Sequence, residues 1–377
     1  MIFLKRQNFL SSLLALGLSL MLLLRSAELG NGIRKGLEIC SFSVIPALFP
    51  FMVLSVFICK SSLSDFFAKA FLPVTKLLRL PKDSAGAIFA SLIGGYPTGA
   101  KCINDLVISG KIDRKSAERM LCFCVNAGPP FLISAVGTGI FGSTKTGFLL
   151  FFAQLFSAAV IAFSLRFFAE KSSFPEYSAF LEKKSKASCL TESVISAAES
   201  CFNMCAFIVL SFGLLELFEN GALFSAIKSP IAKALFSGAV EVTAGCFSAG
   251  EAEGFSAIIA AGAIASFSGI SVMLQVASAT KKSGISLLPF FISRFFHAGL
   301  TSGFVFAFLR LFGEAAEVFS VKGGSYEAVL SASVPAAVSL LCMASLFLLS
   351  LVPPKSEKEP LLKRLKEKFA KKEIPLR

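Results

Sequence analysis

The chain has 377 residues, of which 55% are hydrophobic and 16% charged, and its mean hydropathy is +0.75. A soluble core of this length cannot bury so much apolar surface, so the composition predicts an all-α polytopic membrane protein. The net charge of +13 does not indicate nucleic-acid binding, because the basic residues lie between apolar runs and in the tail, where they orient spans and contact lipid.

Hydrophobic runs long enough to cross about 30 Å of hydrocarbon occur eight times, and the first is expected to be an uncleaved span. They lie at 9–27, 38–59, 120–142, 146–168, 190–218, 255–279, 286–310 and 328–352. Two further apolar stretches, 84–100 and 236–250, are too short or too rich in glycine to cross. We interpret them as re-entrant hairpins.

Lysine and arginine predict the orientation of these spans. With the spans above, 27 of these residues fall on one side of the membrane and 7 on the other. The richer side holds the N-terminus and the segments 60–83, 101–119, 169–189, 280–285 and 353–377. Because positively charged loops stay in the cytoplasm, both termini are expected to be cytoplasmic.

The same order of segments occurs twice. A span, a hairpin and two more spans lie at 38–168 and again at 190–310, and the two hairpins enter from opposite sides. This order predicts an inverted repeat, in which broken segments mark a transporter's binding site. The expected parts are an N-terminal span and loop (1–35), a first repeat (36–168), a cytoplasmic linker (169–189), a second repeat (190–310), a C-terminal span (311–352) and a basic cytoplasmic tail (353–377).

Short motifs echo each other between the two halves. The run GGYPTG at 94–99 corresponds to GAVEVTAG at 238–245, and NAGP at 126–129 corresponds to SFSGIS at 266–271. The run GGYPTGAK lacks the Gly-Lys-Ser/Thr end of a phosphate loop, which argues against nucleotide hydrolysis.

The tip of the first hairpin is a candidate solute site formed by Gly95, Tyr96, Pro97 and Thr98. Glycines and a proline free backbone amides there, and the Thr98 hydroxyl can bind a solute. The alternative is a structural turn whose glycines allow close helix packing.

The span at 120–142 is interrupted near its start by Asn126, Gly128 and Pro129. The freed backbone groups and the Asn126 amide can bind a solute, and the alternative is a proline-kinked buried helix. The second half offers corresponding polar or helix-breaking residues. They are Thr243, Ser268, Gly269, Ser271 and Gln275.

Three ionisable residues inside apolar segments complete the candidate site. Glu241 lies inside the second hairpin and is a candidate for proton or ion coupling, unless it pairs with Lys233 or lies at the outer interface. Arg294 and His297 are three residues apart on one helix face and can act together on an anion. The alternatives are an arginine that reaches the membrane surface and a histidine in an interhelical hydrogen bond.

Several motifs together identify a family resemblance over roughly 36–310. They are GGYPTGAK (94–101), FCVNAGPPFLISAVGTGIFGS (123–143), EVTAG (241–245), FSGISVxxQ (267–275) and ISRFFHA (292–298). This combination resembles the sporulation integral membrane proteins built on the nucleoside-recognition, or Gate, domain.

The resemblance implies a fold related to the concentrative nucleoside transporters and the transport of a small solute, dipicolinic acid, in a spore-forming bacterium. The expected location is the cell membrane or a membrane surrounding the forespore. Alternatives are a non-transporting scaffold for sporulation and a nucleoside or nucleobase transporter. The expected partners are a small-molecule solute and membrane lipids, with no nucleic acid, and a homo-oligomer is left open. Neither enzymatic activity nor a cofactor or metal is expected, because no catalytic or metal-ligand constellation occurs at a usable spacing.

Overall fold

The computed structural model describes residues 16–311, apart from 18, 21, 61–62, 170–185 and 220. The described residues are almost entirely helical and contain no strand, which confirms the all-α fold class. The expected C-terminal span at 328–352 and the tail at 353–377 lie outside the described residues, as do most of the linker at 169–189 and much of the span at 9–27.

The helices are named in chain order. The first half contains α2 (Ser26–Ile39), η1 (Cys40–Val44), α3 (Ile45–Lys60), α4 (Leu63–Leu77), α5 (Ser84–Ile108), α6 (Arg114–Cys124), η2 (Pro130–Ile140), α7 (Thr144–Leu165) and η3 (Arg166–Phe168). The second half contains α8 (Lys186–Glu219), α9 (Ala222–Ser225), α10 (Pro230–Val240), α11 (Val242–Gly250), α12 (Phe255–Phe267), α13 (Gly269–Thr280) and α14 (Leu288–Leu311).

Five helical stretches of the described residues are long and apolar enough to cross a membrane. They are Ser26–Ile58, Thr144–Phe168, Leu190–Glu219, Phe255–Thr280 and Leu288–Leu311. Each one overlaps an expected span, and together they support an integral membrane protein.

One sequence prediction differs from the structure, and one expected break can be placed in it. The expected loop at 25–37 is instead the helix α2, which continues through η1 into α3. The interruption expected near the start of the span at 120–142 lies between two shorter helices, α6 and η2, which an extended segment at 125–128 separates. Pro129 and Pro130 supply no backbone N–H, so the hydrogen-bond ladder of one helix cannot run through this segment.

Side-chain caps explain where several helices begin. Asp113 accepts a hydrogen bond from the backbone N–H of Ser116 (3.1 Å) at the start of α6. Ser143 does the same for Thr146 (3.2 Å) at the start of α7. Each side chain satisfies a donor that has no partner within the helix.

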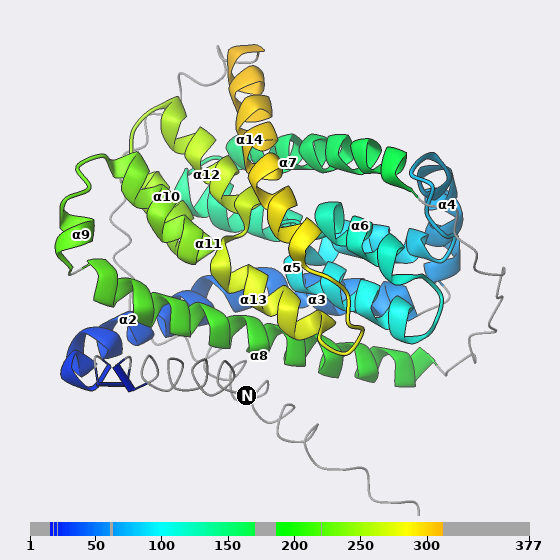
Figure 1. Cartoon of the computed structure of the whole chain (residues 1–377), viewed down its shortest axis with the longest axis horizontal. Coiled ribbons are helices and arrows are strands. Elements are labelled where there is room, and N and C mark those ends of the chain that lie inside the picture. The colour runs from blue at the N-terminus through cyan, green and yellow to red at the C-terminus, as the bar shows by residue number, and fades with distance from the viewer. Residues whose placement is uncertain are drawn as a thin grey trace, which may run out of the picture.

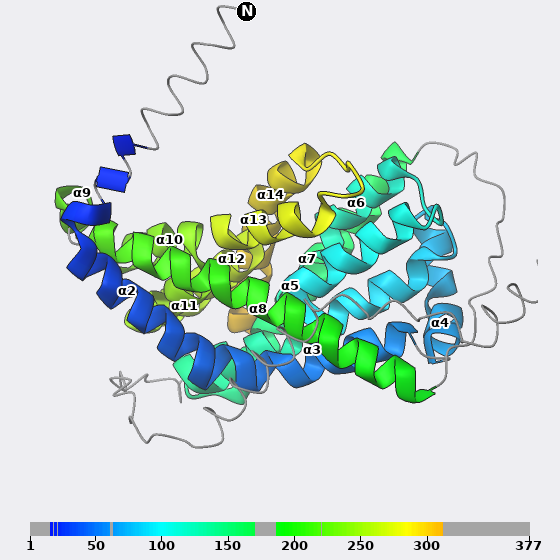
Figure 2. The ribbon, with the colours of Figure 1, turned by 90° about the horizontal axis from the view of Figure 1, so that it is seen from below.

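Small residues bring the long helix α8 against α2. Gly32 and Gly36 of α2 are buried, and a Cβ on Gly36 would lie only 2.9 Å from the Cα of Val209 in α8. Figures 1 and 2 both show α2 beside α8, and Lys35 pairs with Glu216 across them (2.8 Å). On another side of the molecule α14 packs against α7 and α12. Close packing of this kind, through small residues, is typical of helices within a membrane.

Candidate functional site

The first candidate site element is the break inside α5. Gly95 has φ +75° and ψ −165°, a conformation that glycine adopts without steric penalty. A Cβ on Gly99 would lie 3.0 Å from the Cβ of Ser91, although residues eight apart in a straight helix are separated by about 12 Å. The two arms of α5 therefore fold against each other, with Gly95 at the tip.

Two side chains at this tip are buried and hydrogen-bonded. The Tyr96 hydroxyl donates to the carbonyl oxygen of Ala265 near the end of α12 (2.5 Å). The Thr98 hydroxyl donates to the carbonyl oxygen of Gly94 (3.0 Å), within the same tip. Tyr96 therefore ties the first half of the chain to the second, whereas the Thr98 hydroxyl donor is already used locally.

The second element is the hairpin of α10 and α11, with Glu241 at its tip. A Cβ on Gly245 would collide with the Cα of Gly238. The backbones of α10 and α11 are therefore in direct contact at these two glycines. Glu241 is 2% exposed, and its Oε2 accepts a hydrogen bond from the backbone N–H of Ala244 (2.7 Å). Its carboxylate thus caps α11, a structural role that the sequence alternatives did not include.

Each hairpin tip packs against a second break from its own half of the chain. A Cβ on Gly128 would lie 3.2 Å from the backbone nitrogen of Gly95. A Cβ on Gly269 would lie 2.8 Å from the carbonyl oxygen of Gly238, just before the second tip. Gly269 follows Ser268, where φ is +77° and α12 gives way to α13. The two halves therefore repeat the same contact, tip against break.

The two tips meet at a small central cavity of about 40 Å³. We call it the central cavity; α3 and α8 complete its wall. It is lined by Val44, Leu48, Met52, Gly94, Gly95, Tyr96, Pro97, Gly128, Phe131, Met204, Ile208, Glu241, Val242, Thr243, Val272 and Gln275. Cavities that hold small molecules measure about 300–1,000 Å³, so the central cavity is too small in this structure to hold a solute.

Seven of the predicted site residues line the central cavity. They are Gly95, Tyr96, Pro97, Gly128, Glu241, Thr243 and Gln275. The other eight do not line it, although six of them belong to the tips or breaks around it. These eight are Thr98, Asn126, Pro129, Ser268, Gly269, Ser271, Arg294 and His297.

Two amide side chains near the cavity keep a buried oxygen without a partner. Gln275 donates to the hydroxyl of Ser271 (3.4 Å), and its Oε1 accepts nothing from the described residues. Asn126 donates to the carbonyl oxygen of Phe123 (2.6 Å), and its Oδ1 is likewise unpaired. A buried acceptor without a donor costs about 1–3 kcal/mol, so both oxygens are suited to bind water or a solute group.

Arg294 is fully buried and binds the ends of two broken helices. Its guanidinium donates to the carbonyl oxygens of Val125 (2.7 Å) and Cys122 at the end of α6. A longer contact of 3.5 Å reaches the carbonyl oxygen of Ser266 at the end of α12. Helix C-termini carry free carbonyls and partial negative charge, which a cation stabilises. Arg294 does not reach a membrane surface, contrary to one alternative.

His297 belongs to a buried polar network between α7 and α14. Its Nε2 lies 3.2 Å from the carbonyl oxygen of Gln154, which matches the interhelical alternative for this residue. The Gln154 side chain donates to the carbonyl oxygen of Ala127 in the first break (3.0 Å). A hydroxyl chain runs alongside, from Ser266 to Thr301 (2.7 Å) and on to Ser157 (3.0 Å).

Gln154, Ser157 and Thr301 were not among the residues predicted from sequence. Gln154 is the only amide side chain in the apolar run of α7. A polar residue inside a membrane span is a functional candidate by default, and this signal could have identified it.

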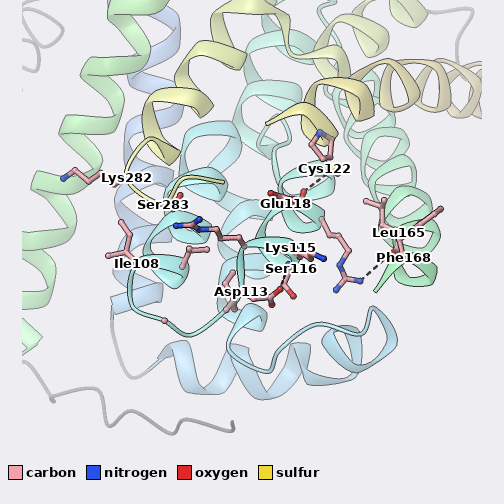
Figure 3. A pocket seen from close by; sticks show the side chains of 16 residues that line it. Ile108, Asp113, Lys115, Ser116, Glu118, Cys122, Leu165, Phe168, Lys282 and Ser283 are labelled. Carbon is pink, nitrogen blue, oxygen red and sulfur yellow. Dashed lines mark hydrogen bonds between the residues drawn. The ribbon is translucent and has the colours of Figure 1, made fainter. Parts of the chain in front are cut away.

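A separate and larger polar groove, of about 1,070 Å³, opens at the ends of α5, α6 and α7 and the loop before α14. Figure 3 shows Glu118 and Cys122 close together, with Leu165 and Phe168 on one side and Lys282 and Ser283 on the other. Two of the segments that line it, 107–119 and 282–283, were expected on the cytoplasmic side. Glu118 in the first of them accepts a hydrogen bond from the backbone N–H of Ser286 (3.1 Å). We call it the polar groove.

Comparison of the chain with protein-family models, with curated proteins and with solved structures gave no match.

Proposed function

We propose that the protein is a membrane transporter or facilitator of a small anionic solute, with dipicolinic acid in spore formation as the specific candidate. The observation that carries this proposal is the meeting of two hairpin tips, one from each half of the chain, at one cavity. Discontinuous helices that meet in this way bind solutes in many secondary transporters.

The direction of the half-helices favours an anion. The second arm of α5, η2, α11 and α13 all begin beside the central cavity. Residues from the first turn of each one line it, namely Pro97, Phe131, Thr243 and Val272. Helix N-termini present free N–H groups and partial positive charge, which together stabilise a negative group.

The repeated contact between tip and break supports an inverted repeat with two re-entrant hairpins, of the type found in concentrative nucleoside transporters. Gly128 contacts the first tip as Gly269 contacts the second. In such a fold the solute gains access from alternate sides as one part moves against the other. The central cavity of about 40 Å³ must widen for this to happen.

Glu241 is the proposed coupling residue. Its buried carboxylate lines the cavity that we assign to an anion. A proton on this carboxylate removes the repulsion between two negative groups, so proton and solute would bind together.

The polar groove is the proposed cytoplasmic access to the site. It is lined by four basic side chains, Arg114, Lys115, Arg119 and Lys282, and by two acidic ones, Asp113 and Glu118. This excess of positive charge attracts anions. One wall includes Cys122, whose carbonyl oxygen is held by Arg294 next to the first break.

The test is uptake of labelled dipicolinate by proteoliposomes that contain the purified full chain. We expect saturable uptake that depends on an inward proton gradient. Glu241→Gln should abolish this dependence, and Glu251→Gln, an exposed residue at the other end of α11, should leave it unchanged.

Three other outcomes would contradict the proposal in different ways. Saturable uptake of a nucleoside instead of dipicolinate would favour the nucleoside transporter. No saturable uptake under a proton or sodium gradient, with folding verified, would count against transport and favour a membrane scaffold. Proton dependence that survives in Glu241→Gln would remove this residue from coupling.

A further inference from the structure

A second groove, distinct from the candidate site, opens between α4, α5, α6 and α7. Its volume is about 530 Å³, within the range of ligand pockets. Its wall is almost entirely apolar and includes Phe71 of α4, Leu78 just after α4, Ile88 of α5, Phe123 of α6, and Ala159 and Phe163 of α7. We call it the apolar groove.

Three arginines lie next to residues of the apolar-groove wall. Arg119 donates to the carbonyl oxygens of Arg79 (2.8 Å) and Leu165 (3.4 Å), so its guanidinium joins the ends of α4 and α7. Arg79 directly follows Leu78 of the groove wall. The Arg166 guanidinium stacks on the ring of Phe163, another wall residue, at 5.0 Å. We call these three residues the arginine cluster.

The arginine cluster is not neutralised by ion pairs within the described residues. None of its three guanidinium groups forms an ion pair with a described carboxylate. Of the neighbouring acids, Asp113 caps α6 through Oδ2 and acts electrostatically on Arg119 without forming an ion pair, and Glu118 binds the backbone of Ser286.

One donor of the arginine cluster has no partner among the described residues. The Nε of Arg166 is buried and makes no hydrogen bond with the described residues. Buried polar groups are nearly always paired, so this donor points to an acceptor beyond the described residues.

We propose that the apolar groove binds one anionic phospholipid, with an acyl chain along the wall and the phosphate at the arginine cluster. Guanidinium groups bind phosphate through paired, charge-assisted hydrogen bonds, and basic pockets beside membrane helices select anionic headgroups. The α7 side of the groove ends in exposed Phe156, Val160 and Phe163, the surface expected to face lipid.

The test is native mass spectrometry of the full chain in detergent, titrated with phosphatidylglycerol or phosphatidylcholine. We expect at least about tenfold tighter binding of phosphatidylglycerol, because each nearby arginine contributes roughly 1 kcal/mol. Arg166→Gln should reduce this preference. Arg310→Gln, an exposed arginine stacked on Phe306 at 5.3 Å, is the matched control and should keep it.

A second variant tests the acyl-chain part. Ala159→Phe places a ring in the apolar groove and should prevent binding of either lipid. Gly303→Phe is the control, because a Cβ there meets nothing within 4 Å.

Three results would overturn the proposal, with folding of each variant checked by thermal unfolding. They are equal binding of the two lipids by the wild type, an unchanged preference in Arg166→Gln, and normal lipid binding in Ala159→Phe.

Discussion

Replacing Arg294 by methionine should strongly destabilise the protein, because it leaves helix-end carbonyls without donors. Arg294 makes two short hydrogen bonds, to Val125 and Cys122, and one long contact to Ser266. Charge-assisted hydrogen bonds contribute about 1.5–3 kcal/mol each, so losing the two short ones removes about 3–6 kcal/mol. At about 2–4 °C per kcal/mol, the melting temperature should fall by at least about 6 °C.

Thermal unfolding in detergent can be followed with a maleimide dye that fluoresces on reaction with thiols. The chain has no tryptophan, but Cys122, Cys124 and Cys201 are free and buried, so they become reactive on unfolding. Arg310→Met is the matched control on the same helix. Its guanidinium is exposed and bonds to no described carbonyl, so its melting temperature should stay close to that of the wild type.

An unchanged melting temperature in Arg294→Met would refute the structural role of this residue. If the same variant also lost affinity for dipicolinate, the guanidinium would instead belong to the solute site, as the sequence analysis expected. Arg294→Lys should be intermediate in stability, because lysine keeps the charge but cannot bind both carbonyls with one planar group.

Three further predictions concern the hairpins and the topology. Tyr96→Phe should lower the free energy of unfolding by about 1–3 kcal/mol, because the carbonyl of Ala265 loses its hydroxyl donor; an unchanged melting temperature would contradict this. Gly95→Ala should destabilise more than Gly254→Ala, since both glycines have positive φ but only at Gly95 does a Cβ meet backbone, and equal unfolding curves would argue against a crowded tip. On a background without native cysteines, an impermeant maleimide applied to intact cells should label Lys145→Cys and spare Lys281→Cys, and the reverse pattern would invert the orientation.

Local chemistry made the breaks predictable. Gly95 and Pro129 interrupt apolar runs, and helix-breaking residues in such runs have few structural outcomes. Hydropathy likewise located the long helices, because span length depends mainly on the thickness of the bilayer. Hydropathy missed α2, because its charged residues Arg34 and Lys35 are typical of a loop. In the folded protein Lys35 pairs with Glu216.

The partners of the buried polar residues could not be predicted. Arg294 and His297 were identified as candidates because they are ionisable and lie within a span. Their contacts, Cys122 and Gln154, are distant along the chain. Both contacts are to backbone carbonyl oxygens, which every residue has, so the residue type does not indicate them. The capping role of Glu241 was missed for a related reason, since a cap is recognised only once the start of its helix is known.

The contact between Arg294 and the end of α6 also limits the order in which the protein is made. Arg294 follows Cys122 by 172 residues, which a ribosome adds in roughly 10–30 s. During that interval the carbonyls of Cys122 and Val125 lack the donor that later satisfies them. The first half therefore completes its packing only after the second has been synthesised. A chain that stalls before position 294 exposes unpaired backbone groups, which makes it a natural target for membrane proteases.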